Sequence, residues 1–157
     1  MNKENKVLAV FDIDGTLLIS GGAGNRSIDR AFEAIFSLKN ATEDIDFIGR
    51  TDRSIFAEIA KSKLGHTLRE GDIEKVKLLY LKYLRDEVEN SKGFKVLSGA
   101  RELLDRLSLM DNVLIGIATG NIEEGARIKL RKAKIEQYFS FGGFDAVSYT
   151  HLTLPTN

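Results

Sequence analysis

The chain has 157 residues, 43% of them apolar and 29% charged, which suits one domain of ordinary size and excludes a disordered chain. Its 23 Lys and Arg balance 23 Asp and Glu, which excludes a general attraction to nucleic acid or anionic membrane. The absence of Cys excludes disulfides, thiolate catalysis and Cys-ligated zinc. Without a membrane-length apolar run or a signal peptide, we expect a cytoplasmic protein, and no protein partner is indicated.

The first predicted strand covers residues 6–11 and reads KVLAVF. A near-continuous apolar run is typical of a strand covered on both faces, as in a parallel sheet. A glycine-rich break, SGGAGN, follows at residues 20–25. Its spacing fits a dinucleotide-binding loop poorly, so we interpret it as a hinge.

Between residues 27 and 90 the apolar periodicity becomes helical, in three stripes. The stripes comprise Ile28, Ala31, Phe32, Ile35 and Phe36; Phe56, Ile59, Ala60 and Leu64; and Ile73, Val76, Tyr80, Tyr83 and Leu84. They predict an all-helical unit of about three helices, inserted at residues 20–91.

Strands and helices alternate again after residue 93. We expect a helix over residues 100–107, a buried strand over 113–118 (VLIGIA) and a strand over 139–144. Asn121 and Glu124 have the spacing of a capping box that would start the helix before the last strand. This alternation predicts the α/β class, with a parallel sheet and right-handed crossovers.

Asp12 and Asp14 stand two residues apart where the first strand ends, so their side chains point the same way. Two crowded carboxylates repel each other unless a cation lies between them or one is protonated, and oxygen ligands suit Mg²⁺. Gly15 permits a sharp exit from the strand, with backbone amides that can face an anion. The alternative is a pair of ordinary turn acids.

The segment VLAVFDIDGTLL resembles the first signature of the haloacid-dehalogenase-like hydrolase superfamily, whose members are mostly Mg²⁺-dependent phosphatases. VLIGIAT resembles the second signature, and the helical insertion resembles the superfamily's cap domain. The text GNIEEGARIKL, followed by YF, is similar to the phosphoglycolate-phosphatase-like branch. The resemblance spans residues 6–145 and implies a Rossmann-like core at 1–19 and 92–145, incomplete at about three strands, with the cap at 20–91.

The resemblance implies that Asp12 attacks phosphorus to form an aspartyl-phosphate, while Asp14 protonates the leaving alcohol and then activates water. The Asp12 carboxylate and the Asp14 backbone carbonyl would ligate Mg²⁺. The substrate would be a small phosphorylated metabolite. The groups that would hold its phosphate lie in two loops, at Gly15, Thr16, Thr119, Gly120 and Asn121.

A basic residue should also neutralise the phosphate, and Lys129 is the best candidate, with Arg127 and Lys132 as neighbouring options. The alternative for Lys129 is a solvated helix face. In the cap, residues 47–52 resemble a loop that faces the active site, so Arg50 could meet a second anionic group of the substrate. The alternative there is a helix N-cap turn made by Thr51 or Asp52.

The fourth signature, an acidic pair that completes the metal site, is missing after Asp145. Residues 147–157 instead look like translated sequencing-adapter DNA, so we expect residues 146–157 to be a non-native tail. The first strand would then be an unprotected apolar edge. Two further hypotheses are a phosphomutase of the same superfamily and a catalytically inactive fragment.

Overall fold

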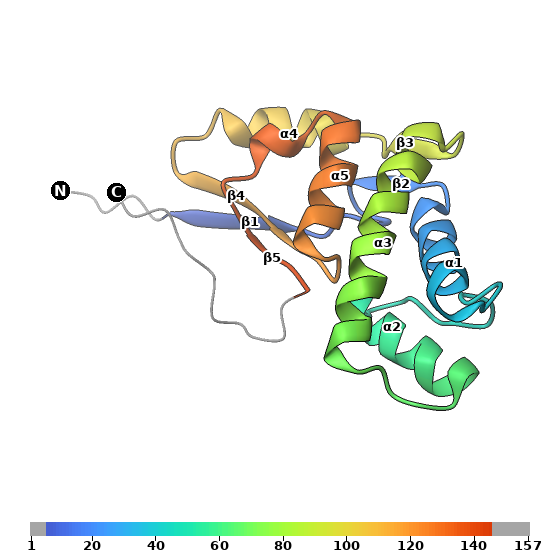
Figure 1. Cartoon of the computed structure of the whole chain (residues 1–157). Coiled ribbons are helices and arrows are strands. Elements are labelled where there is room, and N and C mark those ends of the chain that lie inside the picture. The colour runs from blue at the N-terminus through green and yellow to red at the C-terminus, as the bar shows by residue number, and fades with distance from the viewer. Residues whose placement is uncertain (1–5, 146–157) are drawn as a thin grey trace.

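The structure, a computed structural model, describes residues 6–145 (Figure 1). The expected non-native tail at residues 146–157 lies outside this range. The main sheet of the structure has three parallel strands in the order β1, β4, β5, which confirms the predicted α/β class. Their bounds are Val7–Phe11 for β1, Val113–Ala118 for β4 and Phe141–Gly143 for β5.

Two helices and a short 3-10 turn pack with this sheet around one apolar cluster. The elements are α4 (Ala100–Ser108), α5 (Glu123–Ala133) and η2 (Glu136–Tyr138). The fully buried side chains of the cluster come from the residues just after β1, from α4, from β4, from α5 and from the segment after α5. They include Ile13, Leu18, Leu104, Ile117 and Ile135. This cluster fixes the ends of β1 and β4 beside each other.

Strand β1 is less covered than its apolar sequence predicts. Val7, Leu8 and Val10 are 48%, 50% and 48% exposed, and within residues 6–145 the strand pairs with β4 alone. The expectation of a strand buried on both faces is therefore wrong for the described chain. The expectation of an apolar edge is confirmed there, because the strand has a partner strand on one side only among the described residues and its apolar side chains are half exposed.

The helical insertion forms three α-helices, as the three stripes predict (Figure 1). They are α1 (Ala23–Phe36), α2 (Asp52–Ile59), which runs on into the π-helical turn η1 (Ala60–Leu64), and α3 (Glu70–Asn90). Phe56 lies at their centre, with its ring centroid 6.3 Å from that of Phe32 and 5.5 Å from that of Tyr80. The insertion thus has an apolar core of its own, which Ile122 and Ile128 of the α/β part complete.

The chain passes between the two parts along β2 (Leu18–Ser20) and β3 (Phe94–Val96), which pair antiparallel. Gly21 follows β2 with φ 63°, and a Cβ there would lie 2.6 Å from the Gly93 Cα. The two connections therefore touch backbone to backbone, which fits a hinge better than a nucleotide loop. The domain division at residues 20 and 91 stays a prediction.

Candidate active site

The residues after β1 form a tight turn that exposes two carboxylates. The amides of Leu17 and Leu18 both donate to the Ile13 carbonyl, at 2.9 and 3.1 Å, and the Ile13 side chain is buried. Asp12 and Asp14, on either side of Ile13, are exposed. The Asp12 Oδ1 accepts the Ile13 amide at 2.8 Å. The alternation predicted for the two acids is therefore present, with both facing the carboxyl end of the sheet.

The turn uses the amides of Gly15 and Thr16 for its own hydrogen bonds. The Gly15 amide donates to the Leu18 carbonyl at 2.9 Å, and the Thr16 amide donates to the Ile13 carbonyl at 3.2 Å. Gly15 has φ 77°, a conformation that favours glycine. The backbones of these two residues therefore shape the turn. The Thr16 side chain is exposed beside the two acids.

The loop after β4 meets the acids through Asn121. Its Nδ2 donates to the Asp14 Oδ2 at 2.8 Å and to the Thr119 Oγ1 at 2.7 Å. The Thr119 amide donates to the Gly143 carbonyl at 3.0 Å, which ties the loop to β5. Because parallel strands end at the same sheet edge, residues more than one hundred positions apart become direct neighbours.

Lys129, on α5, points into the same edge. It is 4% exposed, and its Nζ lies 2.7 Å from the Asp14 Oδ2 and 2.6 Å from the Asn121 Oδ1. The neighbouring candidates lie elsewhere, since Arg127 pairs with Glu123 and Glu136, and Lys132 pairs with Glu89. A buried ammonium needs such partners, because an unpaired charge there would be costly.

A family model described as haloacid dehalogenase-like hydrolase matches residues 9–143. The chain belongs to this family. The matched range contains Asp12, Asp14, the loop at residues 119–121 and Lys129, together with the helical insertion. No curated protein matches the chain.

Solved structures of haloacid dehalogenase-like proteins share the fold. A predicted phosphoglycolate phosphatase from Haemophilus somnus 129PT has a TM-score of 0.63 and 18% identity, over 92% of this chain and 64% of its own. The HAD-hydrolase described as YfnB of Bacillus subtilis, bound to magnesium, has a TM-score of 0.51 and 17% identity, over 90% and 66%. A protein described as a β-phosphoglucomutase from Thermotoga maritima has a TM-score of 0.51 and 17% identity, over 88% and 61%. The chain thus spans less than two thirds of each.

The start of α5 differs from the capping prediction, which is wrong. The Asn121 side chain contacts Asp14, Thr119 and Lys129, and the helix begins one residue later, with Ile122 at the N-cap. The amide of Ile122 instead donates to the Asp52 Oδ2 at 2.8 Å. The Asp52 carboxylate, from the helical insertion, therefore accepts a backbone amide at the start of α5, a role that local spacing assigned to Asn121.

Asp52 belongs to this site, although the sequence indicates it only as a possible N-cap. The N-cap of α2 is Thr51, in a capping box with Ser54. Asp52 is 9% exposed, and burial raises its pKa to about 6, although the nearby Lys129 ammonium opposes the shift. No local pattern in the sequence signals this burial, because it depends on how the cap packs against the loop after β4.

Arg50 lies beside the same loop through its backbone. A Cβ at Gly120 would overlap the Arg50 carbonyl oxygen, so only glycine permits this approach. The Arg50 guanidinium lies 3.7 Å from the carboxylate of Glu58, in the last turn of α2. The structure therefore brings the Arg50 main chain to the site, while its side chain pairs within the cap.

Metal-ligating groups are few in the described chain. Residues 6–145 contain no cluster of three or more His, Cys, Asp or Glu that could hold an ion. Asp12 offers an exposed carboxylate, whereas the Asp14 carboxylate is occupied by Lys129 and Asn121. This donor set fits Mg²⁺, which takes few protein oxygens and keeps water and phosphate ligands.

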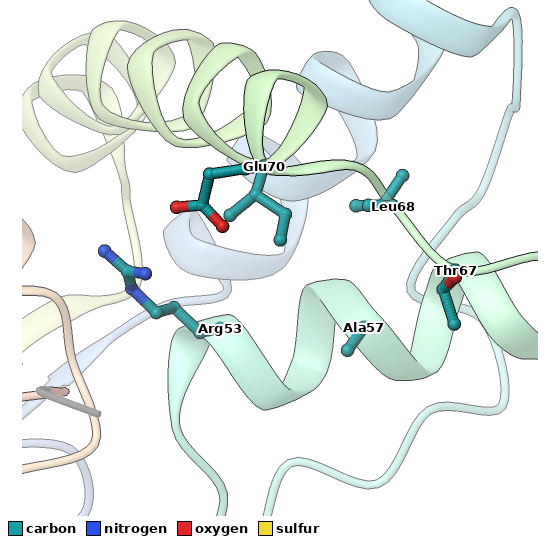
Figure 2. Close-up of a pocket in the computed structure, with 6 residues that line it drawn as sticks. Arg53, Ala57, Thr67, Leu68 and Glu70 are labelled. Atoms are coloured by element: carbon teal, nitrogen blue, oxygen red, sulfur yellow. The ribbon is translucent and has the colours of Figure 1, made fainter. Parts of the chain in front are cut away.

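A separate hollow of about 260 Å³ lies in the cap, between α2 and the start of α3 (Figure 2). It is lined by Arg53, Ala57, Thr67, Leu68, Glu70 and Ile73. None of the predicted site residues lines it, so the candidate site is the open edge of the sheet.

None of the described helices is long and apolar enough to cross a membrane.

Proposed function

We propose that the chain encodes a Mg²⁺-dependent phosphatase that hydrolyses a small phosphorylated metabolite. The observation that carries the proposal is the linked set of polar groups at one sheet edge. There the Asp14 carboxylate accepts hydrogen bonds from both Lys129 and Asn121, beside the exposed Asp12. Family membership supports this assignment. The cytoplasmic location expected from the sequence is part of the proposal.

Asp12 is the proposed nucleophile. Its carboxylate oxygen attacks phosphorus, the bond from phosphorus to the substrate oxygen breaks, and an aspartyl-phosphate forms. Asp14 gives a proton to the leaving oxygen and then takes a proton from water. That water attacks the phosphorus, which releases inorganic phosphate and regenerates Asp12. The hydrogen bonds from Lys129 and Asn121 hold Asp14 in position for both transfers.

Lys129 and the loop at residues 119–121 supply the proposed phosphate site. The Lys129 ammonium provides positive charge, and the Thr119 hydroxyl and the Gly120 and Asn121 amides provide hydrogen-bond donors near the α5 N-terminus. Gly15 and Thr16 contribute the turn that presents Asp14 and the Thr16 side chain. Preorganised donors of this kind stabilise charge that develops on the phosphoryl oxygens.

Mg²⁺ is the proposed cofactor, held by the Asp12 carboxylate and the Asp14 backbone carbonyl. It would neutralise phosphate charge when bound. The support is the hard oxygen chemistry of these donors, together with the magnesium described in the Bacillus subtilis relative.

The substrate class is proposed to include small phosphorylated carboxylic acids, with Arg50 as the contact for the second anionic group. The support is the position of Arg50 on the loop against Gly120 and the name given to the Haemophilus somnus relative. For this role the Arg50 guanidinium would leave Glu58, an exchange that an exposed pair at 3.7 Å permits at little cost.

The test is phosphate release from phosphomonoesters by the full chain, with and without Mg²⁺. We expect activity that EDTA abolishes and added Mg²⁺ restores, and a loss of at least about 1,000-fold in Asp12→Asn. Asp29→Asn is the matched control, because Asp29 accepts the Thr42 amide at 2.7 Å within the cap, away from the site. No phosphate release from the wild-type chain, or equal release in Asp12→Asn, would overturn the proposal.

A phosphomutase is the second candidate, favoured by the β-phosphoglucomutase description of the Thermotoga maritima relative. In that case the aspartyl-phosphate returns its phosphoryl group to a sugar hydroxyl instead of to water. Appearance of an isomeric sugar phosphate without free phosphate, followed by ³¹P NMR, would replace the phosphatase with the mutase.

A further inference from the structure

The carboxylate of Asp52 joins the helical cap to the loop after β4. Asp52 is the first residue of α2, and its own amide donates to the Gly120 carbonyl at 2.8 Å. Its Oδ2 accepts the Ile122 amide, also at 2.8 Å. One residue of the cap thus makes two hydrogen bonds, one in each direction, to the loop that carries Thr119, Gly120 and Asn121.

The surroundings of Asp52 are poor for a charge. It is buried, and its polar neighbours are the Ile122 amide and the Tyr80 hydroxyl, which donates to Oδ2 from 3.4 Å. The Lys129 ammonium on α5 attracts it, whereas the carboxylates of Asp14 and Asp145 repel it. A buried carboxylate in such a place costs free energy unless the hydrogen bonds that it accepts offset the loss of water.

A second link beside Asp52 ties the cap to the same loop. The Asp145 Oδ2 accepts the Arg53 amide at 2.8 Å, and the Asp145 amide donates to the Asn121 carbonyl at 2.9 Å. The contact between Gly120 and the Arg50 carbonyl, where a Cβ has no room, adds a close backbone approach. The positions of the loop amides therefore depend on the N-terminal turn of α2.

We propose that Asp52 is a positioning residue, which holds the loop at residues 119–121 in its phosphate-binding geometry by accepting the Ile122 amide. The inference rests on the proposed function, because it concerns the phosphate site of that function. Asp52 itself reaches no substrate atom in this role and acts through the amides next to Ile122. A cap that moves would thereby also move part of the phosphate site.

Two substitutions separate the hydrogen bond from the charge. Asp52→Ala removes the acceptor of the Ile122 amide, so we expect the loop to lose order and inorganic phosphate to bind about 10-fold more weakly. Asp52→Asn keeps a carbonyl oxygen of the same reach, so we expect affinity within about 2-fold of wild type at pH 7. Asp29→Ala, which removes a carboxylate that accepts an amide within the cap, is the matched control.

The experiment is a titration of the full chain with inorganic phosphate in the presence of Mg²⁺, followed by ¹H–¹⁵N NMR at the Gly120 and Asn121 amides. A pH titration of the Ile122 amide in the same samples is the second readout. We expect its chemical shift to follow Asp52, with a midpoint near pH 6 in wild type and in Asp29→Ala and no such step in Asp52→Asn. A residue that merely fills space would produce no such step.

The outcomes are distinguishable. Equal phosphate affinity in wild type and Asp52→Ala overturns the inference and leaves the proposed function intact. Loss of affinity in Asp52→Asn as large as in Asp52→Ala also overturns it, because charge rather than the Ile122 contact would then matter. If Asp52→Ala does not fold, the Ile122 titration decides, and a flat profile in wild type overturns the inference. No response of the wild-type loop to phosphate overturns the proposed function, and the inference with it.

Discussion

The helical cap and the parallel sheet bury their apolar residues to different degrees. In the cap, Phe32, Phe56 and Tyr80 are almost completely enclosed by α1, α2 and α3. In the sheet, Val7 and Leu8 of β1 leave about half of their surface exposed, within residues 6–145. The difference teaches that the inserted helices close their own core, whereas β1, which leads to the proposed catalytic acids, pairs on one side only within the described residues.

The largest test of this contrast removes a ring from the cap core. Phe56→Ala should lower the free energy of unfolding by about 3–5 kcal/mol. The variant loses the free energy of burying the ring and its contacts to Phe32 and Tyr80, and it leaves a cavity. Val10→Ala on β1 should cost less than about 1 kcal/mol, because the Val10 side chain is half exposed. Urea unfolding followed by circular dichroism measures both. Similar losses in the two variants would remove the contrast.

Local sequence patterns predicted most of the fold correctly. Period-3.6 stripes gave the cap helices, and apolar runs gave β1 and β4, because these signals depend only on which face of an element is buried. The coverage of β1 was predicted wrongly from the strand itself. The exposure of β1 depends on which elements lie beside it in the fold. An apolar run of six residues has the same pattern at the edge of a sheet as at its centre.

The site divides in the same way. The spacing of Asp12 and Asp14 predicted where their carboxylates lie, because alternation along a strand is local. The hydrogen-bond acceptor at the start of α5 could not be predicted, because the Ile122 amide donates to Asp52, seventy residues earlier in the chain. Lys129 stood among several basic residues on one helix, and only the packing of α5 selects the one that meets Asp14.

The junction between the two regions should respond to pH. Burial raises the pKa of Asp52 to about 6 from 3.8, so the folded chain binds more protons than the unfolded chain between these values. Asp52 therefore favours folding most below about pH 4, and its contribution falls as pH rises to about 6. The free energy of unfolding of Asp52→Asn minus that of wild type should rise by up to about 3 kcal/mol from pH 4 to 7.

Urea titrations of both chains at closely spaced pH values would measure that difference. Partial burial opposes ionisation of Glu87 and Glu124, but hydrogen bonds from arginines outweigh it and lower the pKa values of both acids. Both acids are present in both chains, so their contributions to the difference cancel. A difference that stays flat between pH 4 and 7 would show that Asp52 is not buried as a charge.

The hinge between the regions gives a smaller effect. Gly21→Ala should cost about 2 kcal/mol, because alanine is strained at φ 63° and its Cβ would press on the Gly93 backbone. Gly24→Ala, three residues later inside α1, is the control, because a Cβ there meets nothing within 4 Å. Alanine in a helix should stabilise the chain by up to about 1 kcal/mol. A cost for Gly21→Ala no larger than that for Gly24→Ala, measured by thermal unfolding, would contradict the close crossing.

The smallest effect on stability is expected at the open edge, where the readout is association. An apolar edge strand offers unpaired backbone groups to other chains, and lysine on such a strand discourages pairing. Leu8→Lys should change the free energy of unfolding by less than about 1 kcal/mol but reduce concentration-dependent association in sedimentation velocity. Leu109→Lys is the matched control, because Leu109 is 83% exposed and lies just after α4, outside the strands. An equal reduction of association by both lysines would show that exposed apolar side chains in general cause it. It would contradict association through the edge of β1.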